Sequence, residues 1–264
     1  MATFAGTWLL PLFFLLAGSE LRKEIVSGVF TKRKALLLPF FAAVFGVLIP
    51  FLIFIFITKS LGTSSDGWGV VLATDLPLVI IALRLLGQDI SRRIRTYLLS
   101  IAIFDDLIAI LIIALALNQN GIHPTVVAFI LGILIPINFN NYRILKSLSE
   151  FLVLPIFLIS TIWANWSPHI GLIALAVIIA RIIGKPIGVL LGDFLARKST
   201  GIQLLSRNEI LAVGLLASLG LSVSLLFAQI AKASGEIYFA VLLTIPVAFA
   251  VISVAKRLAF RTLK

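Results

Sequence analysis

The chain has 264 residues, of which 61% are hydrophobic and only 12% are charged, and its mean hydropathy is +1.16. A soluble domain needs a polar surface on every side, so this composition indicates an all-α, polytopic membrane protein instead. The absence of cysteine excludes disulfides and thiolate-bound metal, and the formal net charge of +11 suggests nucleic acid as a partner unless the basic residues follow another pattern.

Apolar segments recur along the whole chain, so residues 1–264 are expected to form one integral membrane domain. A helical span needs roughly 17–25 mostly apolar residues. The breaks between the segments are turn-like or charged, such as GTSSDG at 62–67 and NQNG at 118–121. Nine transmembrane helices are predicted, at about 3–19, 35–58, 68–87, 97–117, 122–138, 151–166, 169–192, 209–231 and 236–255.

The basic residues occupy every second loop of this nine-span arrangement. Seventeen of the 22 lie in 20–34, 88–96, 139–150, 193–208 and the C-terminal tail, whereas the alternate loops hold only Lys59 and Lys232. Positively charged loops stay in the cytoplasm, so the N-terminus is predicted outside and the C-terminus inside. The orientation of the chain in a lipid bilayer therefore explains the excess of basic residues, and nucleic acid is not expected as a partner.

Ionisable side chains also lie inside the predicted spans, where each costs about 2.5–3.5 kcal/mol at mid-helix. Asp105 and Asp106 begin about nine residues into their span, which is roughly 14 Å deep at 1.5 Å per residue. Asp75 and Lys185 lie deep in other spans. Since adjacent helical positions diverge by about 100°, one carboxylate of the pair can face a cavity while the other meets a neighbouring helix.

Carboxylates at this depth can take up a proton or coordinate a small hard cation, and the two uses exclude each other. That competition is a simple physical basis for exchanging a proton for a metal ion. The alternative is structural: Lys185 pairs with one aspartate between helices, and Asp75 caps a helix break. A single lysine cannot neutralise both members of the acid pair. Arg84 lies near the end of its span and can snorkel to the surface, whereas Arg181 lies deeper and has no assigned role.

Two of the predicted spans contain helix-interrupting features. In LATDLPLVI at 72–80, Pro77 removes a hydrogen bond and frees an upstream carbonyl group. In LLASLGLSVSLL at 215–226, Ser218, Ser222 and Ser224 cluster around Gly220. Transporters often pair broken helices whose ends point at a site near the membrane midplane. Close helix packing through small residues explains the second cluster equally well.

Five segments carry a family signal. They are FFLLAGSELRKEIVSG, ATDLPLVIIALRLLG, LSIAIFDDLIAILIIALAL, GIHPTVVAFILGILIP and IIGKPIGVLLGDFLA. In this order they resemble the NhaA family of sodium/proton antiporters, with a central signature of Thr-Asp, about thirty residues, Asp-Asp and then Gly-Lys-Pro. The resemblance implies an inverted-repeat transporter fold with crossing broken helices.

The resemblance also implies roles by position. Asp105 and Asp106 match the paired aspartates that bind sodium and carry protons, and Lys185 matches the lysine that pairs with the first of them. Thr74 and Asp75 match the unwound segment of one crossing helix. The remaining matches are Gly220 and Ser222 in the other crossing helix, and Glu20 and Glu24 near a cytoplasmic funnel implicated in pH response.

The implied function is secondary antiport in the bacterial inner membrane, with cytoplasmic sodium or lithium exchanged for external protons. Apart from these ions no cofactor is implied. An enzyme is not expected, because no HExxH motif, nucleophile elbow or phosphate-binding glycine loop is present. A sodium-coupled carrier of an organic anion is one alternative, although the adjacent acid pair would repel an anion.

The chain departs from the family pattern in length. Family members have twelve spans, and the first helix, the dimer-forming hairpin after it and two central helices after residue 117 have no counterpart here. The fold is therefore expected to be incomplete, and a homodimer stays open. The Ile-Ala expected after Thr-Asp is Leu76-Pro77. A truncated, non-transporting family member is the second alternative.

Overall fold

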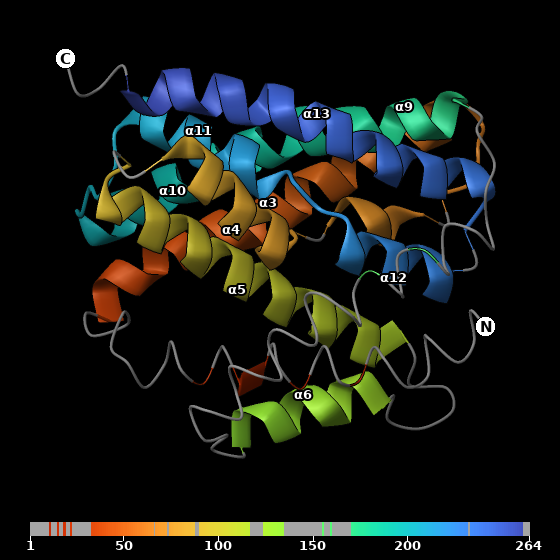
Figure 1. The fold of residues 1–264 in the computed structure, drawn as a ribbon, viewed down its shortest axis with the longest axis horizontal. Coiled ribbons are helices and arrows are strands. Elements are labelled where there is room, and N and C mark those ends of the chain that lie inside the picture. The colour runs from red at the N-terminus through yellow and green to blue at the C-terminus, as the bar shows by residue number, and fades with distance from the viewer. Residues whose placement is uncertain are drawn as a thin grey trace. The chain divides into compact units, whose positions relative to one another are not determined.

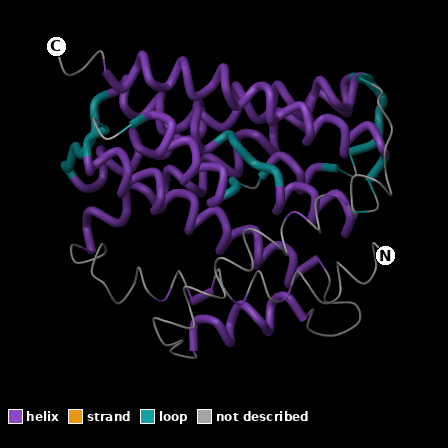
Figure 2. The backbone as a smooth tube through the Cα atoms, viewed as in Figure 1, coloured by secondary structure: helices purple, strands orange, loops and turns teal. Residues whose placement is uncertain are grey.

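A computed structural model describes residues 33–65, 67–72, 74–87, 90–116, 124–134, 170–231 and 233–260, and the single residues 11, 15, 18, 19, 22, 155 and 159. These ranges contain helices and no strand, which confirms the all-α class (Figure 2). Most of the predicted spans at 3–19 and 151–166, and the residues Glu20 and Glu24, lie outside the described residues.

The chain divides into two compact units. The first comprises residues 1–31 and 107–165, and the second comprises residues 32–106 and 166–264. Helix α5 (Arg92–Ala116) contributes to both, and its part up to Asp106 belongs to the second unit. Apart from Glu20 and Glu24, every residue of the predicted site therefore belongs to the second unit.

In the first unit, helix α6 (Pro124–Leu134) packs closely against residues near the N-terminus, namely Leu15, Gly18 and Ser19. A Cβ atom on Gly18 or Gly132 would overlap a backbone carbonyl of the other segment, so glycine is required at both positions. Arg22 Nη1 donates to the carbonyl oxygens of Ile133 and Leu134, at 2.8 Å each. An arginine at this place satisfies carbonyl groups that the last turn of a helix leaves unpaired.

The second unit is built on a long helical segment that combines α9 (Leu172–Ile179), a π-helical turn (Ala180–Gly184) and α10 (Lys185–Thr200). It packs against α3 (Arg33–Ser60) through glycines at every fourth position. A Cβ on Gly184, Gly188 or Gly192 would meet the backbone of α3. This spacing of small residues lets two helix backbones approach closely, as it does in membrane helix pairs.

On its other side α10 contacts α11 (Arg207–Ala217), which in turn lies against α13 (Gly235–Phe260) (Figure 1). The core between these helices consists mainly of small and branched apolar side chains. Fully buried examples are Ala42, Ala43, Ala176, Val189, Val213 and Ala217. Small residues shorten the distance between helices, so the polar groups carried by α10 come within reach of its neighbours.

Within the described ranges, three helices are long and apolar enough to cross a membrane: Leu36–Ser60, Leu172–Thr200 and Gly235–Leu258. They carry large apolar side chains on their outer faces, including Phe56, which is 72% exposed. An outer face of this kind suits hydrocarbon better than water. The total of nine spans stays a prediction.

Both predicted interruptions occur as breaks between helices. The span predicted at 68–87 consists of the 3-10 helix η2 (Trp68–Val71), a non-helical segment and α4 (Leu76–Leu86). The span predicted at 209–231 consists of α11, a break at 218–221 and α12 (Ser222–Ile230). Pro77 is the second residue of α4, where the missing amide hydrogen is tolerated because first-turn amides have no partner within the helix.

Two helices continue beyond the membrane spans predicted for them. Arg92, Arg93 and Arg95 belong to the first turn of α5, and α10 continues to Thr200, well beyond the predicted end at 192. In both cases a charged terminal turn was assigned to a loop, because charge was taken to end the membrane span. A helix that leaves the bilayer can continue for further turns with its basic side chains in water.

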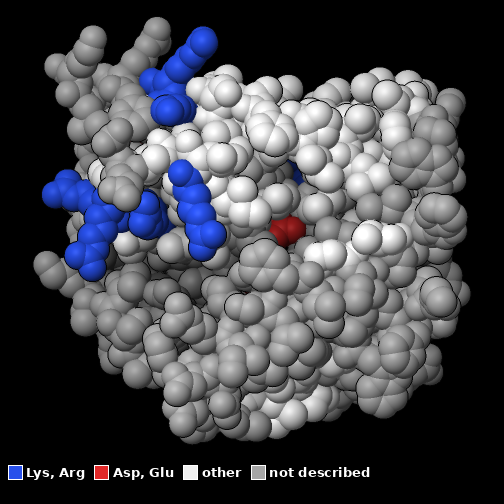
Figure 3. Space-filling view, in the orientation of Figure 1, with Lys and Arg blue, Asp and Glu red and all other residues white. Residues whose placement is uncertain are grey.

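Basic side chains of the second unit gather at one end of its helices, and Figure 3 shows them on one part of the visible face. Figure 1 places the start of α5, the end of α10, the start of α11 and the end of α13 at this end. The described basic residues there are Arg84, Arg92, Arg93, Arg95, Arg197, Lys198, Arg207, Lys256 and Arg257. Arg84 is exposed in the last turn of α4, and its snorkelling to the membrane surface stays a prediction.

Candidate functional site

The two helix breaks meet and exchange hydrogen bonds. The backbone amide of Asp75 donates to the carbonyl oxygen of Leu219 at 2.9 Å, and the amide of Leu221 donates to Asp75 Oδ2 at 3.3 Å. Thr74 Oγ1 lies 2.8 Å from the carbonyl oxygen of Ala217, the last residue of α11. Each break thus supplies partners for backbone groups that the other interrupted helix leaves unpaired.

One buried carboxylate serves the starts of two helices. Asp75 is the N-cap of α4, where Oδ1 accepts from the amide of Leu78 at 3.4 Å, while its other oxygen accepts from Leu221, the N-cap residue of α12. Helix N-termini carry partial positive charge, which a carboxylate stabilises. Asp75 therefore has the capping role considered as the structural alternative, and a role in ion transport stays a prediction.

Asp105 forms a fully buried ion pair with Lys185. Lys185 Nζ lies 2.7 Å from Asp105 Oδ2, and each residue is 1% exposed. Thr74 Oγ1 lies 2.5 Å from the same carboxylate oxygen. The threonine hydroxyl has a single proton, so it can donate either to Asp105 or to Ala217 at one time.

Lys185 also binds the C-terminal end of η2. Its Nζ donates to the carbonyl oxygen of Leu72 at 2.6 Å, directly after η2. Carbonyl groups at a helix C-terminus are unpaired and carry partial negative charge, which an ammonium group stabilises. Asp75 and Lys185 therefore place opposite charges at the two sides of one helix break.

The two neighbouring aspartates differ in their surroundings. Asp105 is completely buried, whereas Asp106 is only partly buried, as expected for residues about 100° apart on a helix. No described residue donates a hydrogen bond to Asp105 Oδ1. Asp106 also interacts electrostatically with Lys185. One amine thus serves two carboxylates, the arrangement for which the sequence predicted incomplete neutralisation.

A second cation is buried beside this site. Arg181 is 1% exposed, its Nη2 donates to Ser224 Oγ at 2.9 Å, and it interacts electrostatically with Asp75. The sequence offered two signals for this contact. Arg181 precedes Lys185 by four residues, which places both on one helix face, and Ser224 belongs to the hydroxyl cluster after Gly220.

The helix geometry changes directly before Lys185. Pro186 has no amide hydrogen and crowds the carbonyl group four residues earlier, and the wider π-helical turn at Ala180–Gly184 accommodates this. On the other side, a Cβ on Gly214 would come within 2.7 Å of Pro186 Cα. Lys185 is therefore positioned by a local distortion held against α11.

Gly220 and Ser222 lie in the second break and at the start of α12. The carbonyl oxygen of Gly220 accepts from Thr244 Oγ1 of α13 at 3.2 Å. Ser222 begins α12, and its side chain lies outside the part of the chain that the structure describes. The contact at Gly220 joins the break to α13 and leaves its role in transport a prediction.

Sequence reasoning missed a second polar bridge between α5 and α10. Tyr97 Oη donates to Asp193 Oδ1 at 2.8 Å, Asp193 forms an ion pair with Arg197, and Arg197 Nη2 donates to the carbonyl oxygen of Leu205 at 2.5 Å. Asp193 was assigned to a solvated loop, so no buried partner was sought for it. The 3% exposure of Asp193 shows that the bridge is buried.

The site contains the ligand types that a small hard cation prefers, namely carboxylate, hydroxyl and backbone carbonyl oxygens. The described residues hold no cluster of three or more His, Cys, Asp or Glu side chains of the kind that retains a metal centre. Since Lys185 and Thr74 already occupy Asp105 Oδ2, a proton or a cation bound there must replace one of these contacts.

Comparison with known proteins gives a consistent family match. The profile of a family described as Na+/H+ antiporter 1 matches residues 1–120 and 115–255. The Na(+)/H(+) antiporter NhaA of Wigglesworthia glossinidia brevipalpis is 29% identical over 286 residues, covering 84% of this chain and 72% of that protein. The NhaA proteins of Aeromonas hydrophila subsp. hydrophila and Frankia casuarinae are 28% and 25% identical, covering 86% and 89% of this chain and 72% and 69% of their own length.

The comparisons also indicate an internal difference in length. The alignment with the Wigglesworthia protein runs over 286 positions, more than the 264 residues of this chain, so the relative holds internal residues without a counterpart here. The two profile matches overlap at residues 115–120, which include residue 117. The absence of two whole helices after that residue, which the family resemblance implies, stays a prediction.

Proposed function

Because the chain belongs to the Na+/H+ antiporter 1 family, we propose that it exchanges cytoplasmic sodium or lithium for external protons through Asp105 and Asp106. Proteins of this family are membrane antiporters and not enzymes. The observation that carries the proposal is the buried pair of Asp105 and Lys185 at the meeting point of two broken helices. In such a pair, a proton or a sodium ion can take the place of the lysine ammonium group at the carboxylate.

When Asp105 is protonated, the site offers an acceptor for the new O–H group. A protonated Oδ2 can donate to Thr74 Oγ1, and the threonine hydroxyl can then donate to the carbonyl oxygen of Ala217, 2.8 Å away. Lys185 keeps the carbonyl oxygen of Leu72 as an acceptor when the carboxylate loses its charge. The polar groups named here therefore stay paired in both protonation states, which lowers the cost of changing between them.

Cation binding requires a different exchange of partners. Asp105 Oδ1 receives no hydrogen bond from the described residues, so it is the oxygen through which we expect sodium to approach. The less buried Asp106 supplies a second negative charge beside it. Sodium and proton cannot both occupy Asp105, so binding of one favours release of the other. This competition, with the broken helices alternating the access, constitutes antiport.

The basic end of the second unit is the proposed cytoplasmic side. Short loops rich in lysine and arginine remain in the cytoplasm, and the described basic residues gather at one end of these helices (Figure 3). This orientation places the C-terminus inside a bacterial inner membrane and the N-terminus outside. The complete arrangement is proposed to be a single domain of nine spans with an inverted-repeat core.

A non-transporting family member is the second candidate. The observation that favours it is the internal segment present in the relatives and absent between the two matched parts of this chain. That segment would supply packing surface in the longer proteins. The site residues that the structure describes are nevertheless all contained in the second unit.

Everted membrane vesicles test the proposal. With a fluorescent probe of the proton gradient, the wild-type protein is expected to give sodium-dependent dequenching, and Asp106→Asn is expected to abolish it. Glu209→Gln is the matched control, because glutamine preserves the capping box between Ser206 and residue 209. Full dequenching in the Asp106→Asn protein would reject the site. No dequenching in the wild-type protein, at normal expression, would favour the non-transporting alternative.

A further inference from the structure

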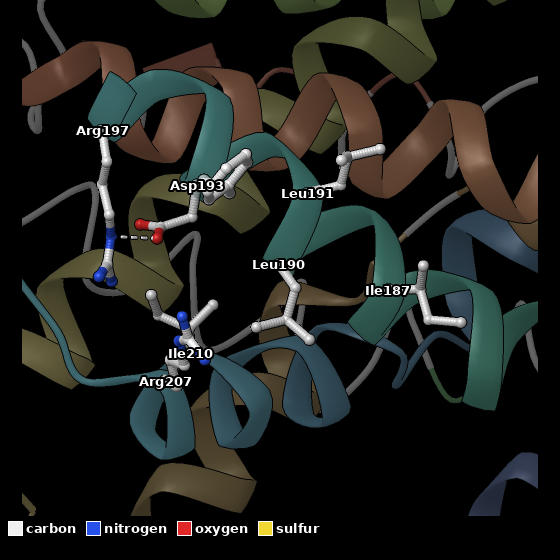
Figure 4. Close-up of a pocket in the computed structure, with 8 residues that line it drawn as sticks. Ile187, Leu190, Leu191, Asp193, Arg197, Arg207 and Ile210 are labelled. Carbon is white, nitrogen blue, oxygen red and sulfur yellow. Dashed lines mark ion pairs between the residues drawn. The ribbon is translucent and has the colours of Figure 1, made fainter. Parts of the chain in front are cut away.

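A pocket of about 360 Å³ lies between α10 and the start of α11 (Figure 4). Its apolar wall comes from Ile187, Leu190, Leu191 and Phe194 of α10. Lys185 and the two helix breaks do not line it. It is therefore separate from the proposed ion site and needs its own explanation.

The apolar wall continues along the helix as an exposed stripe. Ile179, Ile183, Ile187 and Leu191 recur at every fourth position, and Phe194 follows three residues later. These side chains are 37–60% exposed, which is unusual for residues of this type in contact with water. The stripe is about 22 Å long at 1.5 Å per residue, and one leaflet of a bilayer contributes about 15 Å of hydrocarbon. An acyl chain can therefore follow it.

The other end of the pocket is basic. Arg197 and Arg207 line it together with Asp193, and Figure 4 shows Arg197 paired with this aspartate. Asp193 is already engaged by Tyr97 and Arg197, whereas Arg207 is exposed in the first turn of α11. An arginine has five N–H donors, so Arg197 retains donors beyond those directed at Asp193 and Leu205. The pocket thus presents a net positive end to an incoming anion.

We propose that this pocket binds an anionic phospholipid, with its phosphate at Arg197 and Arg207 and an acyl chain along Ile187, Leu191 and Phe194. Basic pockets between membrane helices at the cytoplasmic surface recognise anionic headgroups in this way. The occupant is a lipid because the apolar stripe lies on a membrane-length helix and meets the arginines where that helix ends. The site does not require that the protein transports ions.

Native mass spectrometry of the purified, delipidated protein tests the headgroup contact. Phosphatidylglycerol is expected to be retained at lower concentration than phosphatidylcholine with the same acyl chains. Arg207→Gln is expected to weaken phosphatidylglycerol retention roughly five-fold, the loss that one basic residue at an anionic surface brings. Lys198→Gln removes the same charge from an exposed position at the same helix end, outside the pocket lining, and is expected to have no effect.

A second pair of variants tests the acyl chain contact. Phe194→Ala is expected to weaken phosphatidylglycerol retention, whereas Phe249→Ala, which truncates a 65% exposed phenylalanine on α13, is not. Millimolar inorganic phosphate is expected not to displace the lipid. Equal retention of both lipids, or equal effects of Arg207→Gln and Lys198→Gln in variants that elute as the wild type on gel filtration, would overturn the proposal. Displacement by phosphate with an unaffected Phe194→Ala protein would identify a phosphate site instead.

Discussion

Tyr97 donates a 2.8 Å hydrogen bond to Asp193. Tyr97 lies eight residues before Asp105 on α5, and Asp193 lies eight residues after Lys185 on α10. The two helices are therefore joined by two polar bridges about 12 Å apart, the Tyr97 bridge and the Asp105–Lys185 ion pair. Exchange of a proton or sodium at Asp105 alters the ion pair. The Tyr97 bridge contains neither Asp105 nor Lys185, so it can hold α5 and α10 together while the ion pair between those two residues changes.

Tyr97→Phe is expected to destabilise the protein without changing its apparent affinity for sodium. A hydrogen bond to a charged acceptor contributes about 1.5–3 kcal/mol, and its loss should lower the thermal unfolding midpoint in detergent. The sodium KM in vesicles should stay at the wild-type value, since the changed group lies two turns from Asp105. Asp193→Asn keeps an acceptor for Tyr97 and should cost less than Asp193→Ala. A large rise in the sodium KM of Tyr97→Phe would show that the two bridges are not independent.

Lys185→Met is expected to destabilise the protein by about 3–5 kcal/mol, because it leaves the buried Asp105 carboxylate without its cation. The double variant Asp105→Asn/Lys185→Met should recover part of this loss, since the uncompensated charge is then removed as well. Thermal or denaturant unfolding of the two single variants and the double variant gives the coupling energy. Additive losses would mean that the ion pair contributes nothing as a pair.

Thr74→Val should lower stability by about 1–3 kcal/mol and raise the sodium KM. Valine has nearly the shape of threonine but no hydroxyl, so the one hydrogen bond that Thr74 donates to Asp105 or to the carbonyl oxygen of Ala217 is lost. Thr74→Ser retains the hydroxyl and is the control, which should remain close to the wild type in both measurements. Equal behaviour of the valine and serine variants would exclude the hydroxyl from the site.

Several features of this site could be predicted from the sequence because they depend on position along a helix. The different surroundings of Asp105 and Asp106 and the helix break before Pro77 follow from helix rotation and the missing amide of proline. The clustering of small and hydroxyl residues around Gly220 correctly marked the second break.

The remaining partners depend on which groups face each other across helices, which periodicity does not determine. Nothing in the sequence identifies the carbonyl oxygens of Leu72 and Ala217 as acceptors, because every residue has such a group. Asp193 was misassigned because a short charged stretch looks alike in a loop and in the last turns of a helix. Its buried contact with Tyr97 depends on the register of α5 against α10.

Gly188→Ala should destabilise the contact between α10 and α3 although alanine is the better helix former. An added Cβ would overlap the carbonyl oxygen of Phe45 and approach the Cα of Gly46 to 2.9 Å, and backbone atoms of a packed helix cannot move aside easily. Overpacking of this kind costs about 1–3 kcal/mol, whereas the helix propensity of alanine returns at most about 1 kcal/mol. A lower thermal unfolding midpoint is the expected result.

Gly46→Ala is the matched control for this prediction, because it lies on α3 at the same helix contact. There the added Cβ would meet a methyl group of Val189 at 3.2 Å, and this side chain can yield by a few tenths of an ångström. The gain in helix propensity should then offset the crowding, and the unfolding midpoint should stay near that of the wild type. If both variants lost the same stability, side-chain crowding and not backbone approach would limit the distance between α3 and α10. The position of Lys185 beside Asp105 would then not depend on Gly184, Gly188 and Gly192 of α10.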